Sequence, residues 1–179
     1  MLNIGDKLPE FSLKGYDNKI YTNYDYADKY ALAVIFTCNS SPISKAYAKR
    51  MLNLFEKYEG DNLGIVGINS NDPIQSPEDD FEHMQLVAEK LGLNKLHFLF
   101  LQDNEQIAAQ KFGATVNPEV FLFNRKRELV YKGAIDDSWE NEAMATAVYL
   151  EDAIEEALDG MEIDYPEIPA EGTPIIWKK

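Results

Sequence analysis

Cysteine is almost absent from this sequence, since Cys38 is the only one among 179 residues. A single thiol excludes an internal disulfide framework and any metal centre that needs several thiolates. The imidazoles are also few, with only His83 and His97, which disfavours a histidine-based metal site. We therefore predict that the protein uses neither a metal nor a cofactor.

Basic residues are scarce as well, because 17 Lys and Arg stand against 31 Asp and Glu, for a net charge of −14. Nucleic acids and anionic membranes bind through basic surfaces, so this charge argues against both as partners. The longest apolar run, Ala31–Phe36, is far too short to span a bilayer, and the N-terminus lacks the basic and apolar regions of a signal peptide. We expect a cytoplasmic protein.

The chain is long enough to bury one sizeable core, and its balance of apolar and charged residues is that of an ordinary folded domain. We predict a single domain over residues 1–179. Within it we expect an N-terminal hairpin in residues 1–30, a core in 31–160 and an irregular C-terminal arm in 161–179.

Several short apolar segments predict strands. The central ones lack alternation, which is typical of parallel strands buried on both faces, whereas the first pair and the last pair flank polar turns and predict hairpins. The predicted strands are Pro9–Leu13, Ile20–Tyr24, Ala31–Phe36, Leu63–Ile68, Leu96–Leu101, Val120–Phe123 and Leu129–Lys132.

Longer segments with apolar residues three and four apart predict helices. Pro42 suits the first turn of the first helix, and Ser76 and Asp103 are the expected N-caps of the second and third. We expect Ile107 on the inward side of the third helix, and Met144 at the start of the apolar stripe of the last. The predicted helices run from about Ser41 to Tyr58, Ser76 to Gly92, Asp103 to Gly113 and Asn141 to Leu158.

This order of elements predicts an α/β protein with a thioredoxin-like fold. The first β-α-β unit requires a right-handed parallel crossover, and the final β-β-α unit requires an antiparallel edge. The result is a central mixed β-sheet flanked by helices, with an N-terminal β-hairpin and a helix–strand insertion in the middle.

The most informative position is Cys38, which follows a buried strand and precedes a helix. Unpaired amides and the positive end of the helix dipole both favour a thiolate there. Cysteines in such places can fall from a pKa of about 8.5 to roughly 3.5–7.5, and the thiolate is the nucleophile toward disulfides and peroxides. The alternative is that a lone cysteine is simply a small buried hydrophobe.

A second feature is Asn117-Pro118, just before a predicted strand. A cis-proline at this place in a thioredoxin-type sheet lies against the reactive cysteine and leaves the preceding backbone free to pair with an extended peptide. The alternative is an ordinary trans turn. Asn69–Asp72, at the end of the second buried strand, either rim the same site or form a polar turn.

The sequence resembles the thioredoxin-like and peroxiredoxin-like (redoxin, AhpC/TSA-type) superfamily. It is most similar to a bacterial subgroup with the active-site run F-T-C-N-H-C-P. The matching segments are Gly5–Leu13, Phe36–Asn39 with Pro42, Lys45–Tyr47, Ile68–Asp72, Gly113–Ala114 with Pro118, and Tyr131–Asp137.

The departures from that subgroup concern its thiols. Ser40 stands where the subgroup has His, Ser41 where it has its second Cys, and Thr173 where relatives often carry another Cys; Asn117 replaces the usual Thr. The site is therefore C-x-x-S. The upstream Pro and Thr of the peroxiredoxin signature are also replaced, by Ala31 and Ile35, which weakens a dedicated peroxidase interpretation.

The resemblance implies a thiol–disulfide oxidoreductase or peroxiredoxin-like antioxidant protein that uses one nucleophilic cysteine. Because a serine hydroxyl cannot release a mixed disulfide, an external thiol such as glutathione or a thioredoxin-like protein must do so. The expected catalytic residues are Cys38 and Ser41, whose hydroxyl would hydrogen-bond the thiolate. The expected substrate contacts are Thr37, Asn39, Ser40, Asn117 and Pro118.

Other interpretations remain open. The chain is alternatively a redox-inactive thioredoxin-fold module that binds extended peptides around Pro118, or a variant in which Ser41 was engineered to trap a mixed disulfide. Lys45 and Lys49 either stabilise the thiolate or belong to a solvated helix face. His83 is expected to be exposed, and His97 to be structural.

Overall fold

The computed structural model describes residues 1–96 and 98–179. Its strands are β1 (Ser12–Gly15), β2 (Ile20–Thr22), β3 (Ala31–Phe36), β4 (Leu63–Asn69), β5 (Leu99–Gln102), β6 (Val116–Asn117), β7 (Glu119–Phe123), β8 (Leu129–Gly133), β9 (Glu167–Ile168) and β10 (Thr173–Pro174). Its helices are α1 (Pro42–Tyr58), α2 (Phe81–Leu91), α3 (Leu93–Leu96), α4 (Ile107–Phe112) and α5 (Tyr149–Leu158).

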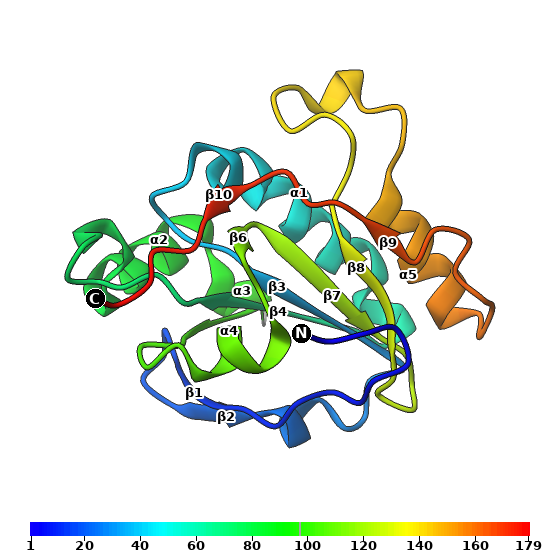
Figure 1. Cartoon of the computed structure of the whole chain (residues 1–179), viewed down its shortest axis with the longest axis horizontal. Helices are drawn as coiled ribbons and strands as arrows, with labels where there is room; N and C mark the ends of the chain where they lie inside the picture. Colours follow the sequence, from blue (N-terminus) through cyan, green and yellow to red (C-terminus); the bar gives the residue numbers. More distant parts are fainter. Residues whose placement is uncertain (97) are drawn as a thin grey trace.

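Within the described residues, one mixed sheet has the order β2-β1-β5-β4-β3-β7-β8-β9, and a small second sheet pairs β10 with β6. The strands β3, β4 and β5 are parallel, whereas β7 runs antiparallel to β3. Helices lie on both faces of the large sheet (Figure 1). This arrangement confirms the predicted α/β fold with a mixed sheet flanked by helices.

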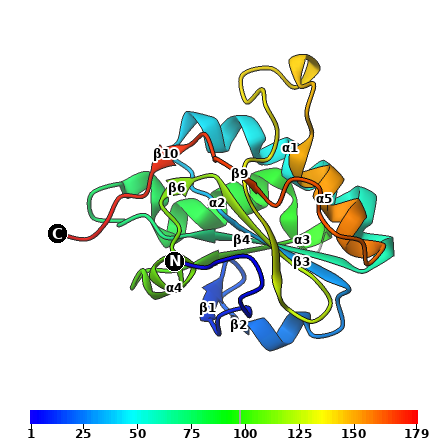
Figure 2. The same cartoon turned by 45° about the vertical axis from the view of Figure 1, so that its right-hand side comes forward.

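The two central strands are buried along their whole length, which explains why their sequences do not alternate. Successive residues of β3 point to opposite faces, so Ala33 and Ile35 join one apolar cluster and Val34 and Phe36 join the other. The first cluster packs under α1, α2 and α5, and the second packs under α4 and the N-terminal segment (Figure 2).

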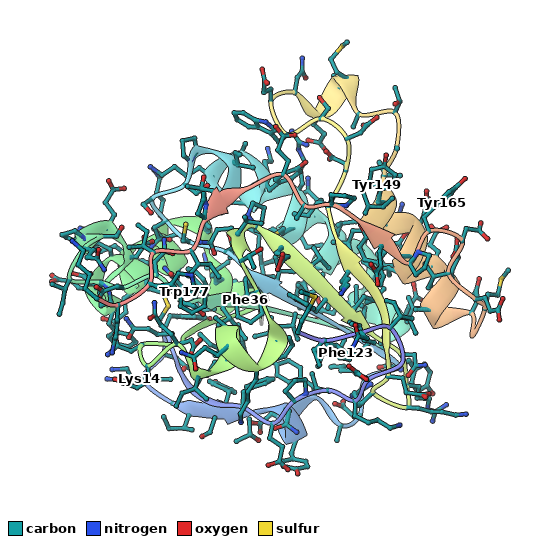
Figure 3. All side chains as sticks on the ribbon, in the orientation of Figure 1. Lys14, Phe36, Phe123, Tyr149, Tyr165 and Trp177 are labelled. Carbon is teal, nitrogen blue, oxygen red and sulfur yellow. The ribbon has the colours of Figure 1, made fainter. Side chains whose placement is uncertain are left out.

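Aromatic rings fill the second cluster. Phe112 of α4 makes edge-to-face contacts with Phe36, Phe121 and Phe123, at ring-centroid distances of 5.2, 5.4 and 6.0 Å. Phe36 and Phe123 are labelled in Figure 3, in the interior of the molecule. This packing fixes the end of β3, from which the Cys38 loop departs.

The predicted N-terminal hairpin is confirmed, but its strands are displaced from Pro9–Leu13 and Ile20–Tyr24. The first begins later because Phe11 N donates to the side chain of Asn23, 3.2 Å away, instead of joining a ladder. The second ends at Thr22 because Thr22 and Asp25 close a capping box on a 3₁₀ turn. Strand β1 also pairs with β5, so the hairpin extends the sheet.

The prediction that the last helix begins at Asn141 is wrong, since α5 begins at Tyr149. Asn141 caps only a 3₁₀ turn, and the Asp137 carboxylate accepts hydrogen bonds from the backbone and side chain of Thr146. These polar contacts hold residues 136–148 as a loop that projects from the body of the molecule, and they leave Met144 exposed.

A buried ion pair anchors the root of this loop. Arg50 of α1 lies 2.8 Å from the Asp136 carboxylate and also donates to the carbonyls of Ser138 and Trp139. The hydroxyl of Tyr47 donates to the same carboxylate at 2.7 Å. Both charged side chains are more than nine-tenths buried, so the pair is screened little by solvent.

The prediction that Ser76 caps the second helix is also wrong. Ser76 precedes a 3₁₀ turn, Pro77–Asp79, and α2 starts later with Asp80 as its N-cap, whose carboxylate accepts from His83 N at 2.8 Å. The helical conformation is interrupted between this 3₁₀ turn and α2, because the Asp79 side chain is directed inward and binds the partners described below. As predicted, the His83 side chain is about half exposed.

Two smaller corrections concern the insertion. The predicted strand Leu96–Leu101 begins only at Leu99, because Leu93–Leu96 forms the short helix α3. The prediction for His97 lies outside the described residues. The prediction that Asp103 is the N-cap of α4 is wrong, since Gln106 holds that position, but the Asp103 carboxylate does accept from the first-turn amides of Ala108 and Ala109.

The inward face of α4 differs from the prediction by one position. Ala109 is fully buried in the second cluster, whereas Ile107 is 54 % exposed. No helix in residues 1–96 or 98–179 has both the length and the apolar character needed to cross a bilayer.

The C-terminal arm runs across the molecule and contains two short strands (Figure 1). Strand β9 pairs in parallel with β8, and β10 pairs antiparallel with β6. Ile175 anchors the arm in the second apolar cluster, whereas Trp177 is partly exposed.

Candidate functional site

The Cys38 loop connects the central strand β3 to α1. The strand pairing continues one residue beyond β3, because Thr37 N donates to Ile68 O at 2.9 Å. Ser41 is the N-cap of α1, and its hydroxyl accepts from Ser44 N at 3.2 Å. Pro42 occupies the first turn as predicted. The loop therefore places Cys38 at the N-terminal end of a long helix.

A buried carboxylate that the sequence did not predict organises one side of this loop. Asp79 is 1 % exposed, and its oxygens accept only hydrogen bonds, with no ion pair to any described residue. The donors are Asn39 N at 2.7 Å, Ser40 N at 3.3 Å, Ser40 Oγ at 2.6 Å, Asn69 Nδ2 at 3.1 Å, Asn71 Nδ2 at 2.9 Å and Ser76 Oγ at 2.7 Å.

These donors keep Asp79 ionised. Burial alone would raise the pKa of the carboxyl, but the hydrogen bonds from Ser40, Asn71 and Ser76 outweigh burial and hold its pKa below the usual value. A negative charge is thus fixed inside the protein beside the Cys38 loop.

The thiol itself lies in a buried, hydroxyl-rich place. Cys38 is 5 % exposed, and its Sγ lies 3.7 Å from Ser40 Oγ and 4.0 Å from Ser44 Oγ. Burial raises the pKa of Cys38, and the Asp79 charge raises it further, against the opposing effect of the Ser41 amide. The expected lowering of the Cys38 pKa is therefore wrong, because desolvation and a nearby anion outweigh the helix N-terminus.

The hydrogen positions at Ser40 strengthen this result. An ionised Asp79 can only accept, so the Ser40 hydroxyl must donate its single proton to Asp79 Oδ2 at 2.6 Å. Ser40 Oγ then has only lone pairs to offer Cys38 and accepts from the S–H group. The Asp79–Ser40 pair consequently stabilises the neutral thiol and not the thiolate.

Ser41 faces the other way. Its hydroxyl lies 2.7 Å from Thr173 Oγ1 in the C-terminal arm and 3.4 Å from the carbonyl of Asn117. Among the described residues no hydrogen bond joins this hydroxyl to Cys38 Sγ. The prediction that the Ser41 side chain contacts the thiolate is wrong, because that side chain caps α1 and binds the arm.

The predicted cis peptide bond is present between Asn117 and Pro118. The neighbouring strand edge is not free, however, because β10 pairs with β6 in the register Thr173↔Asn117 and Pro174↔Val116. The approach is so close that a Cβ on Gly172 would lie 2.8 Å from the carbonyl of Asn117. The expectation of an open edge for an extended peptide is therefore wrong.

Asn71 joins the loop, the cis-proline and the arm. Its side chain donates to Asp79, and its oxygen accepts from Asn117 Nδ2 at 3.1 Å and from Ile176 N at 2.9 Å. The Oδ1 of Asn117 is buried with no partner among the described residues. The interpretation of Asn69–Asp72 as part of the site rim is supported by these contacts.

The structure brings together six residues that the sequence singled out, namely Thr37, Cys38, Asn39, Ser40, Ser41 and Asn117. Asn39 and Ser40 contact Asp79, whereas Ser41 contacts Thr173 of the C-terminal arm. Lys45 is exposed and lies 3.5 Å from Glu78. The sequence analysis did not identify Asp79 or the contact of Ser41 with Thr173. In the part of the chain that the structure describes, no group of at least three His, Cys, Asp or Glu side chains could hold a metal ion.

Comparisons with known proteins agree with this fold. The model of the AhpC/TSA family matches residues 4–132. A hypothetical protein from Sinorhizobium meliloti 1021 has 29 % identity and a TM-score of 0.92, over 99 % of this chain and 96 % of that chain. An uncharacterized conserved protein from Geobacillus kaustophilus has 31 % identity and a TM-score of 0.91, over 99 % and 94 %.

A more distant structure shares the fold alone. Peroxidoxin BcpB from Mycobacterium tuberculosis has 15 % identity and a TM-score of 0.62, over 89 % of this chain and 96 % of that chain. Among curated proteins, none matches the sequence.

Proposed function

The chain belongs to the AhpC/TSA family, and we propose that it acts there as a monothiol oxidoreductase whose Cys38 reacts with a disulfide or a peroxide. The observation that carries the proposal is the position of the only thiol, at the N-terminal end of α1 with hydroxyls at 3.7 and 4.0 Å. A thiolate at this junction can attack a sulfur or oxygen atom of the substrate, and an external thiol can later restore it.

The chemistry needs no second protein thiol. The Cys38 thiolate attacks one sulfur of a disulfide, forms a mixed disulfide and expels the other sulfur as a thiolate. An external thiolate then attacks the mixed disulfide, which restores Cys38 and releases a new disulfide. With a peroxide, Cys38 becomes a sulfenic acid and an alcohol or water leaves; two external thiols then reduce it, with loss of water and formation of their own disulfide.

The raised pKa of Cys38 sets the rate of this chemistry. Since only the thiolate attacks, the reaction is slow at neutral pH and accelerates as the pH rises through the pKa of Cys38. Burial, which raises that pKa, also gives a thiolate of high intrinsic nucleophilicity once it forms.

Intact-protein mass spectrometry after exposure to oxidised glutathione tests the proposal. We expect one glutathione adduct on the wild type, removal of it by excess glutathione, and no adduct on Cys38→Ser. The rate of adduct formation should increase from pH 7 to pH 10. Absence of an adduct at every pH would overturn the proposal.

A second candidate is a redox-inactive binding module. The burial of Cys38 and its raised pKa favour it, whereas β10 opposes its peptide-binding form, since a peptide must displace β10 from β6. An unreactive Cys38 in the experiment above would favour this candidate. The alternative that Ser41 traps a mixed disulfide shares the first chemical step and stays a prediction.

A further inference from the structure

A pocket of about 370 Å³ opens on the side of the Cys38 loop that faces away from the C-terminal arm. It lies between α1 and α2, and Thr37, Cys38 and Asn39 form one end of it. This pocket is lined by Cys38, Met51, Phe98 and Phe100, among others, and each of these four side chains keeps a few per cent of its surface exposed. Solvent therefore has a route to residues around the thiol that does not pass the cis-proline.

The walls of the pocket are mostly apolar. Ala48 and Leu52 of α1 face Val87 and Leu91 of α2, with Phe98 and Phe100 beneath them. Ligand pockets in proteins have this character, an apolar lining with a small number of polar groups that fix orientation. An apolar pocket with a thiol at one end suits a compact apolar molecule better than an extended peptide.

The charged residues at the edge of the pocket indicate which charge the other end of the ligand carries. The only ionisable side chains besides Cys38 among the lining residues are Lys45 and Lys90, in a chain whose net charge is −14. Lys90 forms no ion pair with any described residue, and Lys45 faces Glu78 across 3.5 Å with both side chains more than half exposed. Lys45 lies near the thiol, because it follows Ser44, whose Oγ is 4.0 Å from Cys38 Sγ, and because Asn39 binds the carbonyl of its partner Glu78. Lys90 lies in the last turn of α2, at the end away from the thiol, and can bind a ligand anion there.

We propose that the pocket between α1 and α2 binds a small amphipathic anion, a carboxylate on an alkyl or aromatic body, with the body against Cys38 and the carboxylate at Lys90. A volume of about 370 Å³ lies at the small end of the range of ligand pockets, which suits a molecule of modest size. Decanoate has about this size. The inference rests on the proposed function only in taking a peroxide or disulfide that carries such a body and carboxylate as the substrate.

Isothermal titration calorimetry of the full chain with decanoate at pH 8 tests the binding. We expect decanoate to bind and decylamine, which has the same alkyl body and the opposite charge, to bind at least about tenfold more weakly. Calorimetry measures binding alone and needs no reaction at Cys38. Binding therefore remains measurable even if Cys38 proves unreactive and the proposed function fails.

Matched variants locate the ligand. Val87→Trp fills the pocket and should weaken decanoate binding at least about tenfold, whereas Leu86→Trp, at the adjacent exposed position outside the lining, should leave it within about twofold. Lys90→Glu should weaken binding about tenfold. Lys95→Glu makes the same change of net charge outside the lining and should have little effect.

Protection of the thiol gives a second readout. Decanoate should slow the alkylation of Cys38 by iodoacetamide at pH 9 in the wild type and not in Val87→Trp. Equal binding of decanoate and decylamine, or unchanged binding by Val87→Trp, would overturn the proposal. Binding without protection would also overturn it, because the ligand would then lie away from Cys38.

Discussion

Two adjacent serines of the Cys38 loop have opposite neighbours. Ser40 donates to the ionised Asp79 at 2.6 Å, whereas Ser41 meets the neutral hydroxyl of Thr173 at 2.7 Å. One contact joins the loop to the segment between β4 and α2, and the other joins it to the C-terminal arm. Both contacts are partly buried and both are short, but only the first involves a charge.

The Asp79 side and the Thr173 side of the Cys38 loop therefore have different roles. The Asp79 side influences the protonation of Cys38, because the Asp79 charge raises the pKa of the thiol. In addition, the Ser40 hydroxyl donates its proton to Asp79 and can only accept from the thiol. The Thr173 side covers the strand edge at Pro118 and holds the arm in place. A change on one side should therefore alter thiol chemistry, and a change on the other should alter only stability and access.

The largest effect is expected from Asp79→Asn. The amide would present its NH₂ to the donors Ser40, Asn71 and Ser76, so we expect a loss of about 3–5 kcal/mol in the free energy of unfolding. Removing the anion should also shift the pH midpoint of Cys38 alkylation to lower pH. Urea unfolding and iodoacetamide rates from pH 6 to 11 measure the two effects.

Asp136→Asn is the matched control. It breaks the buried pair with Arg50 and should lower stability by a similar amount, about 3–5 kcal/mol, without moving the alkylation midpoint. If both variants moved the midpoint equally, the effect of Asp79 would be general loosening and the comparison between the two sides would fail.

At acid pH the wild type should lose the stabilisation that the ionised Asp79 provides. Because the pKa of Asp79 is lowered in the folded state, its stabilisation is complete above the unfolded pKa of about 3.9 and is lost as the pH falls through the folded value. The difference in unfolding free energy between the wild type and Asp79→Asn should therefore narrow below about pH 4. A difference that stays constant from pH 7 to pH 2.5 would contradict an ionised Asp79.

On the other side, Ser41→Cys with Thr173→Cys in a Cys38→Ser background should form a disulfide under oxidising conditions. The two oxygen atoms are 2.7 Å apart, so small movements suffice. We expect a gain of about 2 kcal/mol, measured as a higher melting temperature that dithiothreitol reverses. Two free thiols after oxidation, counted by a thiol reagent, would show that the arm does not lie on Ser41 in solution.

The smallest effects are expected from single hydroxyl deletions. Ser40→Ala and Thr173→Val should each cost about 1 kcal/mol. Only Ser40→Ala should shift Cys38 alkylation toward lower pH, because it removes the acceptor of the S–H group. Equal alkylation profiles for the two variants would mean that Ser40 does not hold the thiol proton.

Local sequence signals predicted much of the fold. The unbroken apolar runs of β3 and β4 indicated burial on both faces, and Ser41-Pro42 indicated where α1 begins. The start of α5 could not be predicted in this way, because its apolar spacing continues back to Met144 while Asp137 holds Thr146 in a loop. Tertiary polar contacts overrode a helical pattern there.

The sequence predicted only part of the site, because some contacts of the site join segments that are distant in the chain. The junction at Cys38 and the cis bond at Pro118 have signals of their own in neighbouring residues. The roles of Asp79 and Thr173 have none, because Asp79 reaches Asn39 across 40 positions and Thr173 reaches Ser41 across 132. Only the parallel pairing of β3 with β4 brings the Asp79 segment to the loop.

The sequence by itself determined that this protein has one thiol, that the thiol lies between a buried strand and a helix, and that no second cysteine can resolve it. The tertiary structure decided its protonation and its access. The physical reason is that a pKa depends on burial and on charges within a few ångströms, and here both come from segments distant in the chain. Likewise, the arm that covers the edge at Pro118 reaches it only when the sheet is complete.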